Sequence, residues 1–453
     1  MRAHLLPRHH PSESVGKTEL VRIRVMFGIV LALTVIGGCA ILPGSWRTGW
    51  NEPWLDGKER PDTAGSWKLT KLEREDQRFI ALAISGGGSR AANFGAAVML
   101  ELQQRKLLEQ VDLISGVSGG TLPTVYYGLG EKAGAFTDAA VREAMGYNFQ
   151  ASWIRRWFLP QNIFRYWLSD FTRSNIMVQV FDNQLFHEAT YADLRLHPKI
   201  LLNTTVHNDN IRFTYTDEDF SQLHSVLALY PVANAVNASS AFPGAFQDVS
   251  LRNYVTPPRY VHLYDGGPID NLGVQAVIGY MNRNLLGTSL RQLFPKGCVV
   301  FVIDATPASD HPELNHGPSS RSFVDYFVDT NALDAMDAML MESRRSLLSA
   351  MGIPVADQDQ VLKGRLVVSD KEQCGCEVRH VSLRQLLYLD EDEEGSVARL
   401  GKRVTQIKTK FWVSKEEQTD LFDAAKVLTK SLDDQKLLTE ESFGVQCANA
   451  QRG

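Results

Sequence analysis

The stretch FIALAISGGGSR, residues 79–90, decides the fold class of this chain. Phe79 to Ile84 is a continuous apolar run, which is typical of a buried parallel strand rather than of a strand with one wet face. The run ends in Ser85-Gly86-Gly87-Gly88, a sequence suited to a tight turn. Ala91 to Leu108 follows with helical spacing of its apolar residues. The stretch therefore predicts a strand, a glycine turn and a helix.

The same pattern repeats directly downstream. Val111 to Ile114 reads as a second strand, Gly116-Val117-Ser118-Gly119-Gly120 as its turn, and Gly120 to Tyr127 as a second helix. Two such units in succession predict an α/β architecture with a mostly parallel sheet. Later apolar runs predict further strands at Lys199–Thr204, Ile211–Thr216 and Val299–Ile303, and helices at Val232–Ala241 and Val324–Met351. We expect one large domain over residues 78–453, with a core at 79–310 and a packed C-terminal helical extension.

The composition excludes several classes of protein. The chain has 453 residues, 44% of them hydrophobic and 22% charged, which suits a globular fold and not a disordered or collagen-like one. Lys and Arg number 47 against 52 Asp and Glu, so there is no broad basic surface for nucleic acid. Nucleic acid is therefore excluded as an expected partner.

The N-terminal segment has the pattern of an export signal. Arg22 and Arg24 precede the apolar run Val25–Ile36, which is short for a membrane span, and Gly37-Gly38-Cys39 follows. Small residues before a cysteine resemble the bacterial lipobox. We expect residues 1–38 to be a lipoprotein signal peptide, Cys39 to carry the lipid, and residues 39–77 to form a tether and irregular lead-in. The expected location is the bacterial cell envelope, with the outer membrane favoured; an uncleaved membrane helix, or a start at Met26, remains the alternative.

The other four cysteines are too few for a disulfide scaffold. They are Cys298, Cys374, Cys376 and Cys447. The spacing of Cys374 and Cys376 is not that of a zinc site, and export permits disulfides. We expect one or two bridges, with the pairing left open, and no metal.

Three glycine-rich stretches carry the chemistry. Gly86 to Arg90 opens a helix, where backbone amides and the helix dipole favour a phosphate or an oxyanion. Its letters also satisfy a dinucleotide-binding pattern, but the second strand lacks the acidic residue at its end that a ribose requires. Ser118 lies in G-x-S-x-G, the pattern of a nucleophile on a sharp strand-to-helix turn. Asp265-Gly266-Gly267 places a carboxylate on a third tight turn.

In this order along the chain, the three stretches resemble the patatin-like phospholipase family. That family has G-G-G-x-R, then G-x-S-x-G, then D-G-G or D-G-A. Further matches are Ala189-Thr190-Tyr191-Ala192-Asp193-Leu194 and Ala238-Ser239-Ser240-Ala241-Phe242-Pro243, so the likeness covers at least residues 79–275. Departures are Ser85 where many relatives have an acidic residue, Ala91 where they have glycine, and an unexpected Pro123.

The resemblance implies both a fold and a mechanism. The fold is a three-layer α/β/α sandwich with a mostly parallel central sheet and helices on both faces. The implied activity is hydrolysis of phospholipid or lysophospholipid acyl esters by a Ser118–Asp265 dyad, with Gly86, Gly87 and Gly88 as oxyanion donors and no cofactor. Arg90 is implied to orient the loop or to bind the lipid phosphate.

Other mechanisms stay open at the level of sequence. An aspartate of ordinary pKa is too acidic to act well as a base at pH 7, so we expect Asp265 to lie where its pKa is raised. A Ser-Asp-His triad would need His311, His316 or His380, the histidines that follow Asp265. The alternatives in function are a general esterase or thioesterase, and a non-catalytic envelope lipoprotein that binds lipid.

Residues 153–171 interleave aromatic residues with arginines. This composition suits a membrane boundary or a lid over an acyl groove, and equally a buried helical hairpin. We predict that Trp157 and Trp167 contact lipid, which makes a phospholipid membrane the expected partner.

Overall fold

The computed structural model describes residues 50–55, 77–207, 209–255, 259–285, 288–307, 330–354, 363–367, 374–389 and 395–447. The predicted signal segment, Cys39, His311 and His316 lie outside these residues. The chain divides into two compact units, of which the larger comprises residues 49–156 and 172–453. Residues 157–171 belong to the other unit and are described separately below.

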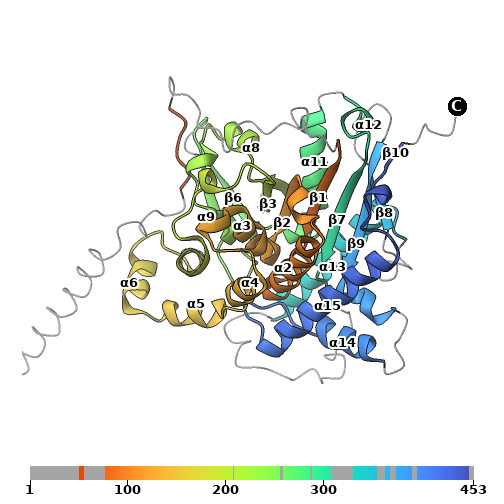
Figure 1. Cartoon of the computed structure of the whole chain (residues 1–453). Coiled ribbons are helices and arrows are strands. Elements are labelled where there is room, and N and C mark those ends of the chain that lie inside the picture. The colour runs from red at the N-terminus through yellow and green to blue at the C-terminus, as the bar shows by residue number, and fades with distance from the viewer. Residues whose placement is uncertain are drawn as a thin grey trace, which may run out of the picture. The chain divides into compact units, whose positions relative to one another are not determined.

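The larger unit is built on a ten-stranded sheet with the order β10-β9-β7-β1-β2-β3-β6-β5, on which β4 pairs with β3 and β8 with β9 (Figure 1). Its strands are β1 (Phe79–Ile84), β2 (Leu113–Val117), β3 (Lys199–Val206), β4 (Ile211–Thr214), β5 (Val249–Asn253), β6 (Arg259–Asp265), β7 (Cys298–Asp304), β8 (Lys363–Val367), β9 (Cys374–Ser382) and β10 (Val445–Cys447). The five central strands, β9 to β3, run parallel, and the outer strands pair antiparallel. The carboxyl ends of β1, β2 and β7 therefore meet at one edge, where a site is expected in open α/β sheets.

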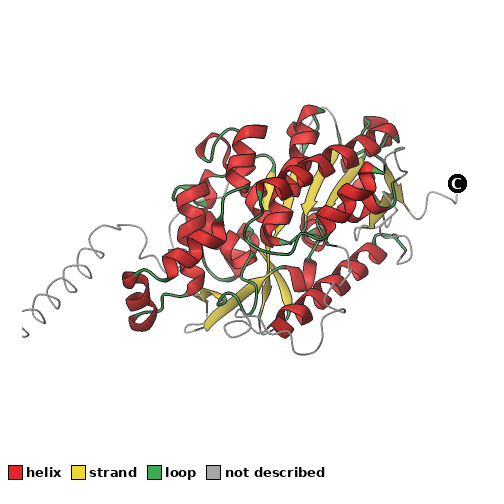
Figure 2. Cartoon of the chain, turned by 90° about the horizontal axis from the view of Figure 1, so that it is seen from below, coloured by secondary structure: helices red, strands yellow, loops and turns green. Residues whose placement is uncertain are grey.

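Helices cover both faces of this sheet, as Figure 2 shows from a second direction. The helices are α2 (Gly88–Gln104), α3 (Thr121–Leu129), α4 (Asp138–Met145), α5 (Phe149–Trp157), α7 (Arg173–Phe181), α8 (Asp217–Gln222), α9 (Val232–Ser239), α10 (Gly267–Asp270), α11 (Val274–Leu285), α12 (Leu290–Leu293), α13 (Thr330–Ala350), α14 (Ser396–Thr405) and α15 (Lys415–Asp434). Alternate residues of β1 enter two separate hydrophobic cores, one shared with α2, α3, α9 and α15 and the other with α11 and α13. The three-layer α/β/α prediction is confirmed.

The predicted elements agree with the structure where their signal was local. The strand Phe79–Ile84 is β1 with the same bounds, and the predicted strand at Val299–Ile303 lies within β7. The helix predicted at Ala91 begins earlier, at Gly88, because the first turn of α2 is made from the glycine-rich stretch itself. The predicted helix at Val324–Met351 is α13, which the structure describes from Thr330.

Two details of the larger unit bear on the sequence predictions. A disulfide joins Cys298 at the start of β7 to Cys376 on β9, and Cys374 is disulfide-bonded as well.

Within the predicted tether, residues 50–55 lie against the larger unit. The Trp54 amide donates to the carbonyl of His224, and the buried Asn51 side chain donates to the carbonyl of Arg252.

The smaller unit contributes one described helix, α6 (Pro160–Leu168). Large apolar side chains on and beside it are exposed, among them Phe158 at 70%, Trp167 at 78% and Leu168 at 80%. Arg165 stacks over the ring of Phe171. Neither α6 nor any other helix in the described part of the chain has the length and apolar content needed to span a bilayer.

Candidate active site

Ser118 lies on a sharp turn directly after β2. It opens a 3₁₀ turn, Ser118–Gly120, that leads into α3, and its φ of 48° is the left-handed conformation that non-glycine residues avoid. The turn is pressed against the glycine-rich loop of residues 85–88, since a Cβ on Gly119 would lie 2.0 Å from the carbonyl oxygen of Gly88. Gly119 and Gly120, which follow Ser118, therefore let two turns from neighbouring strands touch.

Ser239, at the end of α9, holds this turn from the other side. Its hydroxyl accepts a hydrogen bond from the Ser118 amide at 2.9 Å and donates to the carbonyl of Asn203 at 2.6 Å. Its own carbonyl accepts from the Gly266 amide at 3.3 Å. Ser239 is fully buried. In the sequence, Ser239 is marked only by its place in the family match at residues 238–243, although in the structure it contacts the turns of both Ser118 and Asp265.

Asp265 is the last residue of β6 and faces Ser118. Its carboxyl accepts a hydrogen bond from the Gly267 amide at 2.8 Å. Burial raises the pKa of this carboxyl to about 6, although the Gly267 amide and the Ser118 hydroxyl both favour its charged form. The structure thus brings together the two residues that the sequence proposed as a dyad, and gives the aspartate the raised pKa that a base requires.

The glycine-rich loop supplies amides at the N-terminus of α2. The Gly86 amide donates to the carbonyl of Asn271 at 2.9 Å, so it is engaged in holding the loop. The amides of Gly87 and Gly88 have no acceptor within the described residues. Of the three predicted oxyanion donors, the geometry therefore leaves Gly87 and Gly88 available, at a helix end whose dipole favours negative charge.

Asn271 is a second residue without an assigned role in the sequence predictions. A Cβ on Gly86 would lie 2.6 Å from its Oδ1 atom, and a Cβ on Gly267 would lie 3.1 Å from the same atom. The Asn271 side chain therefore fills the space between the glycine-rich loop and the turn that carries Asp265. Its position six residues after Asp265 was the only available sequence signal.

Arg90 lies in the first turn of α2 and is 1% exposed. Its guanidinium donates to the carbonyl of Ala305 at 2.6 Å and to that of Ile407, and to the Thr409 hydroxyl at 3.3 Å. Of the two roles that the resemblance implied, these contacts favour orientation of the loop over binding of a lipid phosphate.

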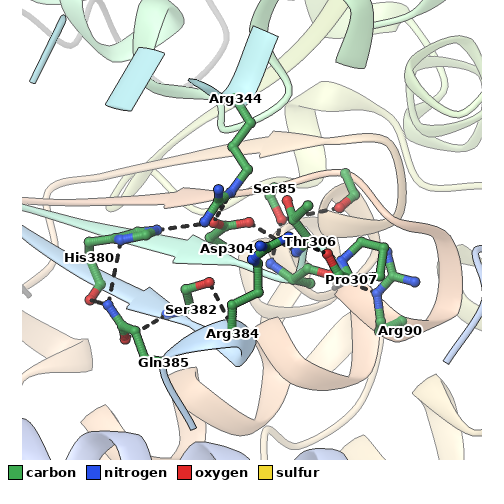
Figure 3. A network of polar contacts seen from close by, with 12 residues as sticks. Ser85, Arg90, Asp304, Thr306, Pro307, Arg344, His380, Ser382, Arg384 and Gln385 are labelled. Carbon is green, nitrogen blue, oxygen red and sulfur yellow. Dashed lines mark hydrogen bonds and ion pairs between the residues drawn. The ribbon is translucent and has the colours of Figure 1, made fainter. Parts of the chain in front are cut away.

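His380, the described candidate for a triad, is engaged elsewhere. It lies on β9, fully buried, with Nε2 3.0 Å from Oδ2 of Asp304 (Figure 3). Its other ring nitrogen is 3.5 Å from the side-chain amide of Gln385. These contacts account for both nitrogens of the ring and give no support to a triad through His380.

Metal-binding side chains do not cluster in the described part of the chain. No group of three or more His, Cys, Asp or Glu side chains there could hold a metal ion.

Comparison with known proteins gives a match to one family model and several matches among solved structures. The patatin-like phospholipase family model matches residues 82–278, whereas no curated protein sequence matches the chain. Among solved structures, the human GIVD cytosolic phospholipase A2 has 13% identity and a TM-score of 0.47, with 83% of this chain and 62% of that chain covered. Its complex with methyl gamma-linolenyl fluorophosphonate has 13% identity, a TM-score of 0.41 and coverages of 82% and 60%.

A bacterial structure, VipD from Legionella pneumophila, has 12% identity, a TM-score of 0.24 and coverages of 88% and 81%. The chain thus spans about three fifths of the length of the human structures that it matches. The family match spans the glycine-rich loop, the turn of Ser118 and the turn of Asp265. Residues 82–278 of this chain form a patatin-like phospholipase domain.

Proposed function

We propose that this protein is a serine acyl hydrolase that cleaves acyl esters of phospholipids or lysophospholipids, with Ser118 as nucleophile and Asp265 as general base. The observation that carries the proposal is that Ser239 joins the turn of Ser118 to the turn of Asp265, whose buried carboxyl has a pKa raised to about 6. Such a carboxyl is ionised at pH 7 and still basic enough to accept a proton. The patatin-like phospholipase match over residues 82–278 supports lipid as the class of substrate.

In the acylation step, Ser118 Oγ attacks the carbonyl carbon of the ester and its proton passes to the Asp265 carboxylate. The carbonyl oxygen becomes an oxyanion, which the amides of Gly87 and Gly88 stabilise. When the tetrahedral intermediate collapses, the bond to the leaving alkoxide breaks and the alkoxide takes the proton from Asp265. The product is an acyl-serine and the first alcohol.

In the deacylation step, water attacks the acyl-serine and gives its proton to Asp265. The second tetrahedral intermediate uses the same amides. Collapse releases the fatty acid and returns the proton to Ser118 Oγ. The cycle needs a single base, which serves both steps.

A fluorophosphonate probe tests the nucleophile directly. We expect the probe to label the wild-type chain and Ser240→Ala, and not to label Ser118→Ala. Ser240 is a matched control because it is buried nearby and its hydroxyl has no partner among the described residues. An unlabelled wild type, or equal labelling of Ser118→Ala, contradicts the enzyme proposal and leaves the non-catalytic lipid-binding alternative.

Hydrolysis of vesicles and soluble esters then tests the substrate class. We expect free fatty acid to be released from phosphatidylcholine or lysophosphatidylcholine vesicles at a higher kcat/KM than from short-chain nitrophenyl esters or acyl thioesters. The reverse order contradicts the lipid proposal in favour of a general esterase or thioesterase.

We further propose that α6 lies against the membrane surface. Its exposed apolar side chains, Trp167 and Leu168 foremost, suit the boundary between water and lipid, where tryptophan is favoured. Trp157→Ala/Trp167→Ala is expected to weaken binding to phospholipid vesicles in a flotation assay, whereas Tyr388→Ala, an exposed aromatic of the larger unit, leaves binding unchanged. Equal binding by both variants contradicts the proposal.

The proposed location is the bacterial cell envelope, with Cys39 as the lipid-bearing residue. Small residues precede this cysteine after a basic and then an apolar segment. Growth with an alkyne fatty acid is expected to label the wild type and not Cys39→Ser. Labelling of both contradicts attachment at this cysteine.

A further inference from the structure

A buried charged network lies at the carboxyl end of β7. Asp304, the last residue of this strand, accepts hydrogen bonds on Oδ2 from Arg344 Nε at 2.7 Å and from His380 Nε2 at 3.0 Å (Figure 3). Asp304 and His380 are fully buried and Arg344 is 3% exposed. Removing these groups from water is costly, and an apolar cluster of similar size commonly stabilises a fold as well. Stability alone is therefore a weak reason for this network.

One connection from the network leads to the glycine-rich loop. The residue after Asp304 is Ala305, whose amide donates to the Ser85 hydroxyl at 2.9 Å and whose carbonyl accepts from Arg90 at 2.6 Å. Ser85 and Arg90 flank the three glycines of the loop. The end of β7 thus fixes both sides of the segment that carries the proposed oxyanion donors.

A second connection leads to the turn that carries Asp265. Arg344 lies on α13, which packs against α10, the helical turn that follows Asp265. The Ser343 hydroxyl donates to the carbonyl of Ile269 at 3.4 Å, and a Cβ on Gly267 would lie 2.5 Å from the Leu340 methyl. The turn that follows Asp265 therefore packs against α13, and its position depends on the position of that helix.

We propose that Arg344 is a positioning residue. Through its pairing with Asp304, it holds the turn that carries Asp265 in a fixed position relative to the glycine-rich loop of residues 85–88. The role rests on the proposed function, because register between base and oxyanion donors matters only if both act on one ester. It follows from the fact that an ion pair between Arg344 and Asp304 joins α13, which supports the turn of Asp265, to the strand end that supports the glycine-rich loop. An apolar contact in its place would allow α13 to slide, whereas the Nε–H to carboxylate bond has one geometry.

Arg344→Met tests the role, because methionine keeps much of the length of the side chain and removes its charge. We expect kcat to fall about 10- to 100-fold, which is the scale of loss when reacting groups are displaced by a fraction of an ångström to an ångström, and KM to change by less than about 3-fold. Arg344→Lys, which keeps the charge, is expected to recover part of kcat. Arg345→Met is the matched control: Arg345 is the next residue on α13, half exposed and paired with Glu342 at 3.2 Å, and its loss is expected to leave kcat unchanged.

A second variant separates positioning from stability. Arg344→Met leaves a buried carboxylate without its arginine, so the melting temperature is expected to fall. Arg344→Met/Asp304→Asn removes that charge, and is expected to recover the melting temperature without recovering kcat. Recovery of kcat together with stability, or a wild-type kcat in Arg344→Met, overturns the role alone. A wild type that hydrolyses no ester overturns the proposed function, and this role with it.

Discussion

Two strand ends in this molecule carry a buried aspartate, and the environment drives the pKa of the two residues in opposite directions. Asp265 ends β6 and Asp304 ends β7, and both are at most 4% exposed. Burial raises the pKa of Asp265 to about 6, and the opposing effects of the Gly267 amide and the Ser118 hydroxyl are too small to cancel it. Burial also disfavours the charged form of Asp304, but Arg344 and His380 outweigh it and hold that pKa well below its usual range.

The comparison teaches how one fold raises the pKa of one buried carboxylate and lowers the pKa of another. Burial is common to both residues, so burial alone does not decide the outcome. The deciding feature is whether a cation compensates for the lost water. Asp304 is stabilised as an anion by its cationic neighbours, whereas the ionised form of Asp265 has a cost in folding free energy.

The largest expected effect comes from neutralising each aspartate in turn. Asp265→Asn is expected to lower kcat by about 10³-fold, which lies within the range that general bases contribute. At pH 8 it is also expected to stabilise the fold, by about 3 kcal/mol at most, since a pKa raised by about two units disfavours the ionised folded state. Asp304→Asn is expected to destabilise the fold, because it leaves Arg344 buried without a carboxylate.

Thermal unfolding and steady-state kinetics on the same two variants check these signs. Linkage sets the direction of each change in the free energy of unfolding. The destabilisation caused by ionised Asp265 is absent below the unfolded pKa of 3.8 and is complete above about pH 6. The contribution of Asp304, whose folded pKa is lowered, is present above the unfolded value and is lost as pH falls. Destabilisation by Asp265→Asn at pH 8 contradicts the comparison.

A smaller loss of kcat is expected when the support between the turns of Ser118 and Asp265, the proposed nucleophile and base, is removed. Ser239→Ala removes the hydroxyl that accepts from the Ser118 amide, and it leaves the left-handed turn of Ser118 without that support. We expect kcat to fall about 10- to 100-fold with little change in KM. Ser240→Ala removes a buried hydroxyl that has no partner among the described residues, so its kinetics serve as the baseline. Equal kinetics in the two variants count against the role of Ser239.

The pH dependence of the wild type sharpens the comparison further. The base must be ionised, so kcat/KM is expected to rise through about pH 6 and then to level off, and at pH 5 to be about a tenth of its plateau. Asp304, with its lowered pKa, does not titrate in this window. Circular dichroism at each pH checks that the chain stays folded. An acid limb that is centred near pH 4 contradicts the raised pKa of Asp265.

The sequence predicts one of the two aspartates and misses the other for a physical reason. Asp265 lies in a local D-G-G turn, and a family resemblance gave it a role. Asp304 follows a plain apolar strand, and its partner Arg344 lies 40 residues downstream on α13, so only the tertiary fold reveals the pair. The same limit applies to Arg90, whose partner carbonyls belong to Ala305 and Ile407.

The strands differ in the same way, since the sequence predicts those with a local apolar signal and misses β6. The apolar runs of β1 and β7 are fully buried and were predicted, because their signal is local. β6, with the sequence RYVHLYD, alternates and is partly exposed, so no apolar run marks it. The sequence therefore does not predict β6, although Asp265 is its last residue. A local motif therefore marks the proposed base, whereas no local pattern marks the strand that carries it.

The smallest expected effect comes from making the surroundings of Asp265 resemble those of Asp304. Leu340 on α13 contacts the Gly267 turn, whose amide donates to the Asp265 carboxyl. Leu340→Lys adds a cation near this carboxyl, so we expect its pKa to fall by about one unit, as for a carboxyl with a nearby opposite charge. The acid limb of kcat/KM then moves to lower pH, and the plateau falls a few-fold because a weaker base accepts the proton less readily.

Met339→Lys is the matched control for this change. Met339 is the preceding residue on α13 and is 50% exposed, so a lysine there is hydrated and screened. Its acid limb is expected to coincide with that of the wild type. If Leu340→Lys also leaves the limb in place while the chain stays folded, the limb belongs to a group other than Asp265, and the contrast between the two aspartates no longer explains the choice of base.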